Sequence, residues 1–192
     1  MKSRLLNISD TVVLDEIEYK INTDFWVWIE IEGLLFDTKT DPLARLAKVL
    51  CLAYPALPQN PYNALQGVLD FYMIDGGKRL GEEIKETYSA VAPSFDIRED
   101  FDYIWGAFMS EYGIDLTESH MHWWKFMTLL ACLSEGCKFS KIVGFRTTDT
   151  SVIKDKGVRQ FYEKMKKQFS LMGKDGALSG EEMVASSLEG LF

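Results

Sequence analysis

Apolar residues recur at steps of three and four positions in successive segments of the chain, and this spacing most constrains the fold. Such a stripe lies on one face of a helix, and its burial requires a second element to cover it. The Asp41-Pro42 and Asn60-Pro61 pairs are typical helix starts, and Gly113 is a typical helix stop. The striped segments are 25–36, 43–54, 65–72, 101–112, 118–133, 139–143 and 158–169. The sequence therefore predicts a mainly α fold.

One segment near the N-terminus has a period of two instead. Ile17, Tyr19 and Ile21 alternate with Glu18 and Lys20. This alternation predicts a small β-hairpin over residues 11–21. Because a lone hairpin is marginal in water, its apolar face should pack against the helices that follow.

Two helical segments carry particular expectations about burial. In residues 118–133, Lys125 is the only charged residue after His122, which predicts a central helix that is apolar all round. Trp123 and Trp124 should then be buried between layers. The stripe of residues 158–169 is likewise expected to face the core.

Composition changes at the C-terminus. We expect residues 1–172 to form a single multi-helix domain and residues 173–192 to form a flexible tail. Ser179 and Glu182 nevertheless match a capping box, and apolar residues follow at helical spacing. The tail could therefore form a short helix on a groove, through Val184, Leu188, Leu191 and Phe192.

Net charge and composition exclude several classes of function. The 192 residues carry a formal charge of -8, which disfavours nucleic-acid binding, and no apolar run reaches membrane-spanning length. There is no signal-peptide pattern, and the three cysteines form no CxxC pair. We expect a soluble, non-exported protein in a reducing cytoplasm, without nucleic-acid or membrane partners.

No pattern in the sequence indicates catalysis. His120 and His122 are two positions apart and so point to different sides of a helix, which disfavours a metal site. One of them should bond a carboxylate such as Asp115, and an enzyme would need these groups in one cleft. The acidic residues Asp96, Asp100 and Asp102 are expected at a helix start, and the segment 75–81 is expected to end a helix. We therefore expect no enzyme activity and no cofactor.

Charge is distributed unevenly along the chain. Residues 1–137 carry a net charge of -11, residues 138–174 carry +7, and the remainder carries -4. The basic residues of segment 138–174 either form a solvated helix face or contact a partner or second copy. Nucleic-acid contact is disfavoured, because Phe161 and Tyr162 fall on the expected core stripe. The candidate contact residues here are Lys154, Lys156, Arg159, Lys164, Lys166 and Lys167.

One string of residues carries a family resemblance. Residues 112–116, Tyr-Gly-Ile-Asp-Leu, are followed by His122-Trp123-Trp124-Lys125-Phe126, then by Phe139, Lys141, Ile142 and Arg146. This pattern resembles the bacteriophage "gene product fifteen" family of long-tailed phages. The likeness runs from about Ile21 to about Leu171. Within it, Asp115, His122, Trp123, Trp124 and Phe126 are interpreted as a structural motif.

The family resemblance implies a specific function, which composition alone does not indicate. Members are similar to tail assembly chaperones, which coat the tape-measure protein, associate with one another and yield to the major tail protein. Such a protein would act in the host bacterial cytoplasm, during infection or prophage induction, and would be absent from the mature virion. The alternative is a minor structural tail component that stays in the virion.

Overall fold

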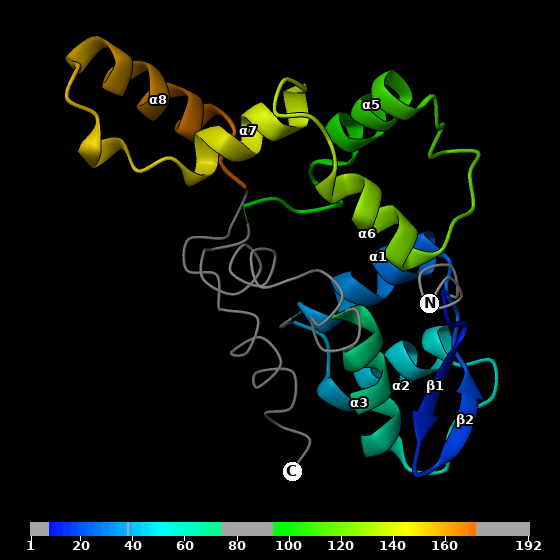
Figure 1. Ribbon diagram of the computed structural model, residues 1–192. Helices are drawn as coiled ribbons and strands as arrows, with labels where there is room; N and C mark the ends of the chain where they lie inside the picture. Colours follow the sequence, from blue (N-terminus) through cyan, green and yellow to red (C-terminus); the bar gives the residue numbers. More distant parts are fainter. Residues whose placement is uncertain (1–7, 38, 74–93, 172–192) are drawn as a thin grey trace. The chain divides into compact units, whose positions relative to one another are not determined.

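The computed structural model describes residues 8–37, 39–73 and 94–171 (Figure 1). The chain groups into two compact units. Of the described residues, 8–73 (apart from 38) and 120–128 belong to the first unit, and 94–119 and 129–171 belong to the second. That residues 1–172 form a single domain remains a prediction. The predicted tail of residues 173–192 and the predicted helix end at 75–81 lie outside the described residues.

The described residues form seven α-helices and one hairpin, which confirms the mainly α fold. The first unit holds β1 (Thr11–Leu14), β2 (Ile17–Lys20), α1 (Phe25–Leu35), α2 (Pro42–Ala53) and α3 (Pro61–Tyr72). The second holds α5 (Phe101–Tyr112), α7 (Lys138–Thr147), the short 3-10 helix η1 (Thr150–Val152) and α8 (Lys156–Gln168). Helix α6 (Trp123–Ala131) contributes residues to both units.

The hairpin is antiparallel and closes with a two-residue turn. Thr11 pairs with Lys20 and Leu14 with Ile17, while Asp15 and Glu16 in the turn have φ angles of 50° and 65°. The Leu14 side chain reaches α3 beside Gly67. The hairpin therefore packs on a helix, as its alternation predicted.

Side-chain caps begin the helices at the predicted positions. The Asp41 carboxylate accepts the amide of Ala44 at 2.9 Å at the start of α2. The Asn60 side chain accepts the amide of Tyr62 at 2.9 Å at the start of α3. These bonds satisfy backbone amides that have no partner within the helix, and they fix the residue at which each helix begins.

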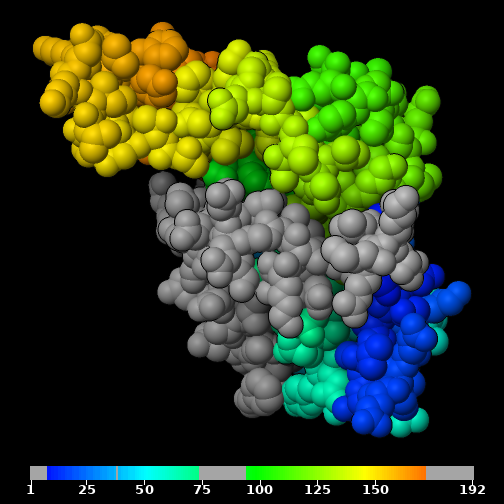
Figure 2. Space-filling view, viewed as in Figure 1, coloured from blue at the N-terminus to red at the C-terminus, as the bar shows by residue number. Residues whose placement is uncertain are grey.

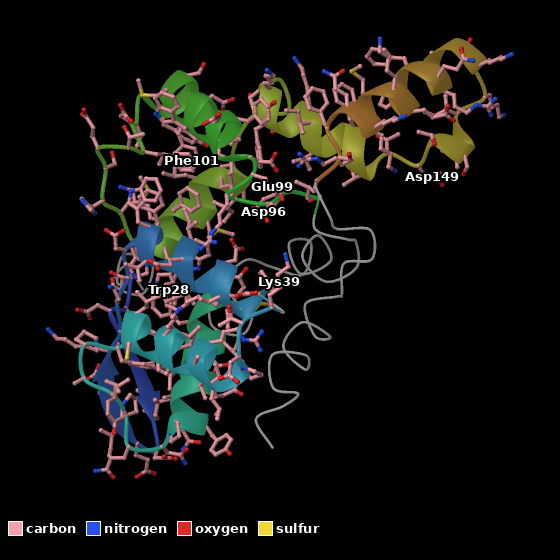
Figure 3. The ribbon with its side chains drawn as sticks, turned by 180° about the vertical axis from the view of Figure 1, so that it is seen from behind. Trp28, Lys39, Asp96, Glu99, Phe101 and Asp149 are labelled. Carbon is pink, nitrogen blue, oxygen red and sulfur yellow. The ribbon has the colours of Figure 1, made fainter. Side chains whose placement is uncertain are left out.

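The core of the first unit is mainly aromatic. The Trp28 ring, labelled in Figure 3, is fully buried and stacks on Phe71 with 4.8 Å between centroids. Phe25 stacks on Phe126 at 4.9 Å. These contacts join α1, α3 and the first turns of α6 in one layer of packed rings.

Helix α6 differs from its prediction. It starts at Trp123, not at residue 118, and Lys125 and Thr128 are exposed. The prediction of a helix buried on every side was wrong for these positions. The physical reason is that Lys125, Thr128 and Cys132, which follows the helix, lie on one exposed face. The buried apolar residues of α6 therefore occupy only the other side of the helix.

Candidate functional site

The α8 helix presents the least covered apolar stripe in the described chain. Its thirteen residues, all of them described, include none that is buried. Val158 is 47% exposed and Phe161 is 51% exposed, while Tyr162 and Met165 are half-buried. The expectation that this stripe faces the core was wrong, because α7 and η1 cover only part of it. Figure 2 shows residues of this region in yellow and orange.

Basic residues lie along the same helix. Lys154 precedes α8, and five further basic residues lie within the helix: Lys156, Arg159, Lys164, Lys166 and Lys167. Arg159 is half-buried and the others are exposed. The structure thus places all six predicted basic contact residues along one short element. We call this set, together with Val158, Phe161, Tyr162 and Met165, the α8 surface.

Aromatic contacts hold α8 against α7. The Phe145 ring of α7 meets Tyr162 edge-on, with 5.7 Å between centroids, and meets Phe161 at 6.0 Å. It also stacks on Phe169, just beyond α8, at 6.2 Å. Phe145 therefore contacts the second half of α8 and the residue that follows it, and Phe161 stays 51% exposed.

An ion pair anchors this part of the second unit. Arg146 at the end of α7 donates two bonds to the Asp100 carboxylate, at 2.6 and 2.8 Å, and Asp100 is 1% exposed. Arg146 also donates to the carbonyls of Ser94 and Phe169, at 3.2 and 2.6 Å. The guanidinium fork therefore joins the segment before α5, the end of α7 and the end of α8. Asp100 was expected only to favour a helix start, and it makes no side-chain cap there.

The loop between α7 and α8 is also tied to the α8 surface. Lys166 donates to the Thr148 carbonyl at 3.2 Å. Hydrogen bonds from Ser151, helped by the positive charge of Lys166, hold the pKa of Asp149 below its ordinary value. Asp149, labelled in Figure 3, therefore stays anionic and complements the last basic turn of α8.

The His-Trp-Trp string lies in the first unit and makes internal contacts. The Trp124 indole donates to the Phe71 carbonyl at 2.8 Å, and the Trp123 indole donates to the Tyr72 carbonyl at 3.4 Å. These carbonyls belong to the last turn of α3, where a helix lacks its own donors. His122 accepts the Trp124 amide at 3.1 Å, and its other ring nitrogen lies 3.1 Å from the Ser9 carbonyl. Phe126 is fully buried.

The groups considered for catalysis have different hydrogen-bond partners. His120 pairs with Asp24 at 2.6 Å, while Asp115 accepts bonds from the Trp105 indole and the Thr117 hydroxyl, at 2.9 and 2.6 Å. The expectation that one histidine bonds a carboxylate is confirmed, but the carboxylate is Asp24 and not Asp115. Hydrogen bonds from Thr117 and Trp105 lower the pKa of Asp115.

The described residues contain neither a metal-ligand cluster nor a helix that could span a membrane. Within residues 8–37, 39–73 and 94–171, no three His, Cys, Asp or Glu side chains are grouped to hold a metal ion. In the same ranges, no helix is both long and apolar enough to cross a bilayer.

Comparison with known proteins identifies the family. The model of the family described as "Bacteriophage Gp15 protein" matches residues 7–171. The chain belongs to the bacteriophage Gp15 family. The match spans the described residues of both units, including the His-Trp-Trp string and the whole of α8, and it ends at residue 171. No curated protein and no solved structure matches the chain.

Sequence reasoning did not identify the apolar half of the α8 surface. Val158 and Phe161 have the spacing of a core stripe, and spacing alone does not show which stripes lack a cover. The density of lysines in 164–167 was the available signal, since a helix with so many charges is covered on one side at most. The tail residues Val184, Leu188, Leu191 and Phe192 lie outside the described residues.

Proposed function

We propose that this phage protein is a non-enzymatic tail assembly chaperone that binds the tape-measure protein through the α8 surface. The observation that carries the proposal is an apolar stripe left half exposed on a firmly anchored helix. Membership of the Gp15 family supports a role in phage biology, and resemblance to tail assembly chaperones supports this particular role.

The chemistry of the α8 surface suits a helical partner. Val158 and Phe161 offer apolar contact area. Helical spacing places Arg159 and Lys166 on one side of this stripe and Lys164 on the other, where they attract acidic residues that flank a partner's own apolar stripe. A long coiled-coil filament repeats such stripes along its length, so it can bind many copies through weak individual contacts.

Copies bound to one filament would also meet one another. The net charge of -11 on residues 1–137 and of +7 on residues 138–174 favours contact between opposite regions of neighbouring copies. We therefore include self-association during tail assembly in the proposal. The major tail protein would displace these copies as the tube grows, in the host cytoplasm.

Co-expression with the tape-measure protein of the same phage tests the proposal. With a tag at the N-terminus of this chain, the partner should become soluble and co-purify with many copies of the chaperone. Val158→Ser combined with Phe161→Ser should abolish co-purification. The matched control is Leu43→Ser with Leu57→Ser, which alters two exposed apolar residues of the first unit and should leave binding intact.

Failure of co-purification with both proteins expressed would contradict the chaperone role. Mass spectrometry of purified virions then separates the alternatives, because a minor structural tail component would be present in the particle and a chaperone would be missing. Tail production should survive His120→Ala and His122→Ala in folded protein, and its loss would support an enzyme.

A further inference from the structure

Helix α5 of the second unit carries another exposed apolar surface. Trp105 is 37% exposed and Met109 is 44% exposed. A Cβ atom added at Gly106 would meet no atom within 4 Å, so the backbone of α5 is open beside these two side chains. Helical spacing places Asp102, which is also exposed, on the same face. We call Asp102, Trp105, Gly106 and Met109 the α5 surface.

The four residues of the α5 surface have the spacing of a hole in helix packing. They stand at positions i, i+3, i+4 and i+7, and four such neighbours on one helix can surround a single side chain inserted from a facing helix. Gly106 in the middle leaves room for a large side chain, and Trp105 and Met109 give the hole apolar sides. The α5 surface therefore suits an exposed aromatic side chain on another helix.

The α5 surface and the α8 surface lie in regions of opposite charge. Residues 94–119 of the second unit include seven acidic residues and one basic residue, a net charge of -6. Residues 129–171, which include α8, have nine basic and four acidic residues, a net charge of +5. The internal pair of Asp100 and Arg146 removes one charge from each region and leaves both signs unchanged. One unit thus presents two apolar surfaces of opposite sign.

Helix α7 separates these two surfaces within one chain. Both α5 and α8 pack on α7, which lies between them in the second unit (Figure 1). Arg146 of α7 fixes this arrangement, because it bonds Asp100 before α5 and the Phe169 carbonyl after α8. The α5 surface of one copy is therefore available to the α8 surface of another copy.

We propose that the α5 surface of one copy binds the α8 surface of a second copy, with Phe161 inserted at Gly106. The occupant is a second copy because α8 has both properties that the α5 surface requires, a basic charge and an aromatic side chain that is 51% exposed. Lys164 lies one turn beyond Phe161 and pairs with Asp102 at the edge of the hole. The contact joins unlike surfaces, so copies add head to tail.

This inference deepens the self-association in the proposed function, and one consequence rests on that function. If the tape-measure protein binds the α8 surface, each α8 surface holds either the tape-measure protein or a neighbouring copy. A head-to-tail row would then reach the tape-measure protein through its one terminal α8 surface. The contact between copies does not require the tape-measure protein, so its test uses the full chain alone.

Sedimentation velocity of the full chain over a range of concentrations measures the association. The wild type should form larger species as its concentration rises into the submillimolar range, since one pair of helices is a small and weak interface. Gly106→Gln fills the hole and should stay monomeric. Gly144→Gln is the matched control, because Gly144 is also a helical glycine with no atom within 4 Å of an added Cβ, and it should associate as the wild type does.

Mixing two variants tests whether the contact is head to tail. Val158→Ser with Phe161→Ser removes the exposed apolar residues of the α8 surface and should be monomeric alone. Mixed with Gly106→Gln, it should form a dimer and nothing larger, because the mixture has one intact surface of each kind. A symmetric contact of α8 with α8, or of α5 with α5, would leave one of the two variants dimeric by itself and would overturn the proposal.

Charge reversal tests the pairing of Lys164 with Asp102. Lys164→Glu should weaken association about tenfold, and adding Asp102→Lys to the same chain should restore it. A wild type that stays monomeric, or a Gly106→Gln variant that associates like the wild type, would also overturn the proposal. Gly106→Gln keeps its α8 surface and should still co-purify with the tape-measure protein, so failure of this contact and failure of the chaperone role give different results.

Discussion

Arg146 satisfies a buried carboxylate and two backbone carbonyls at once. Arg146→Ala would leave Asp100 buried without its ionic partner, which typically costs about 3–5 kcal/mol. We expect a large fall in the midpoint of urea unfolding. The exposed Lys141→Ala variant of the same helix is the control and should change it little. A wild-type midpoint for Arg146→Ala would show that the ion pair adds no net stability.

Two helical glycines should respond in opposite ways to alanine. A Cβ atom at Gly67 would lie 2.6 Å from the Tyr54 hydroxyl oxygen and 3.0 Å from the Leu14 side chain. The Tyr54 hydroxyl cannot easily move, because it donates to the Ala64 carbonyl at 2.8 Å and is buried, which also raises its pKa. Gly67→Ala should therefore destabilise the protein by about 1–3 kcal/mol.

Gly106 in α5 is the matched position, because an added Cβ there meets no atom within 4 Å. Gly106→Ala should stabilise the protein by about 0.5–1 kcal/mol, since alanine loses less backbone entropy in a helix. Thermal unfolding of both variants checks the pair. If Gly67→Ala stabilised the protein, the Tyr54 side chain would be able to move away from the added Cβ atom with little loss of stability.

At the scale of the element, the hairpin turn is closed by residues poorly suited to it. Asp15 and Glu16 both have positive φ, as in a type I′ turn, where Asn-Gly is preferred. Glu16→Gly should stabilise the hairpin by about 0.5–1 kcal/mol, because glycine adopts this conformation without steric cost. Chemical denaturation measures the gain. Lys20→Gly in β2 is the control and should destabilise, and a loss in both variants would contradict this account of the turn.

The end of α5 is joined to the residues after α6 through Glu111. Its carboxylate accepts the Ser134 hydroxyl and amide, at 2.5 and 3.0 Å, and these bonds lower its pKa below 4.5. A carboxyl with a depressed folded-state pKa stabilises the fold above its unfolded pKa. That contribution is lost as the pH falls through the lower folded-state value.

Glu111→Gln should therefore lower the melting temperature at neutral pH, and the difference from the wild type should shrink below pH 4.5. Melting curves across this range measure the difference. If the difference in melting temperature were the same at every pH, the charge of Glu111 would make no contribution to stability.

At the scale of the whole molecule, the prediction of a single domain can be tested by asking whether the two units unfold together. Of the five tryptophans, only Trp105 belongs to the second unit. In Trp105→Phe, tryptophan fluorescence therefore reports on the first unit alone, while circular dichroism reports on helices of both. The single domain predicts coincident urea transitions. Separate transitions would show that the two units unfold independently.

Local signals in the sequence determined the elements. Asp41, Asn60 and Gly113 set helix ends because capping depends on a few neighbouring residues, and the alternation after Ile17 gave the hairpin. The burial of Trp123 and Trp124 also followed from the apolar run around them. Capping and turn formation depend on contacts close in the sequence, which turn chemistry describes directly. The apolar run predicted that Trp123 and Trp124 are buried, but it did not indicate which element covers them.

Only the tertiary structure decided the partners of these elements. The pairing of Asp100 with Arg146, forty-six positions away, and of Trp124 with the end of α3 has no local signal. The partial exposure of Val158 and Phe161 is of the same kind, because their spacing is that of a buried stripe. Helical period fixes which residues share a face, but burial depends on whether another element covers that face, and that is set by packing between distant segments.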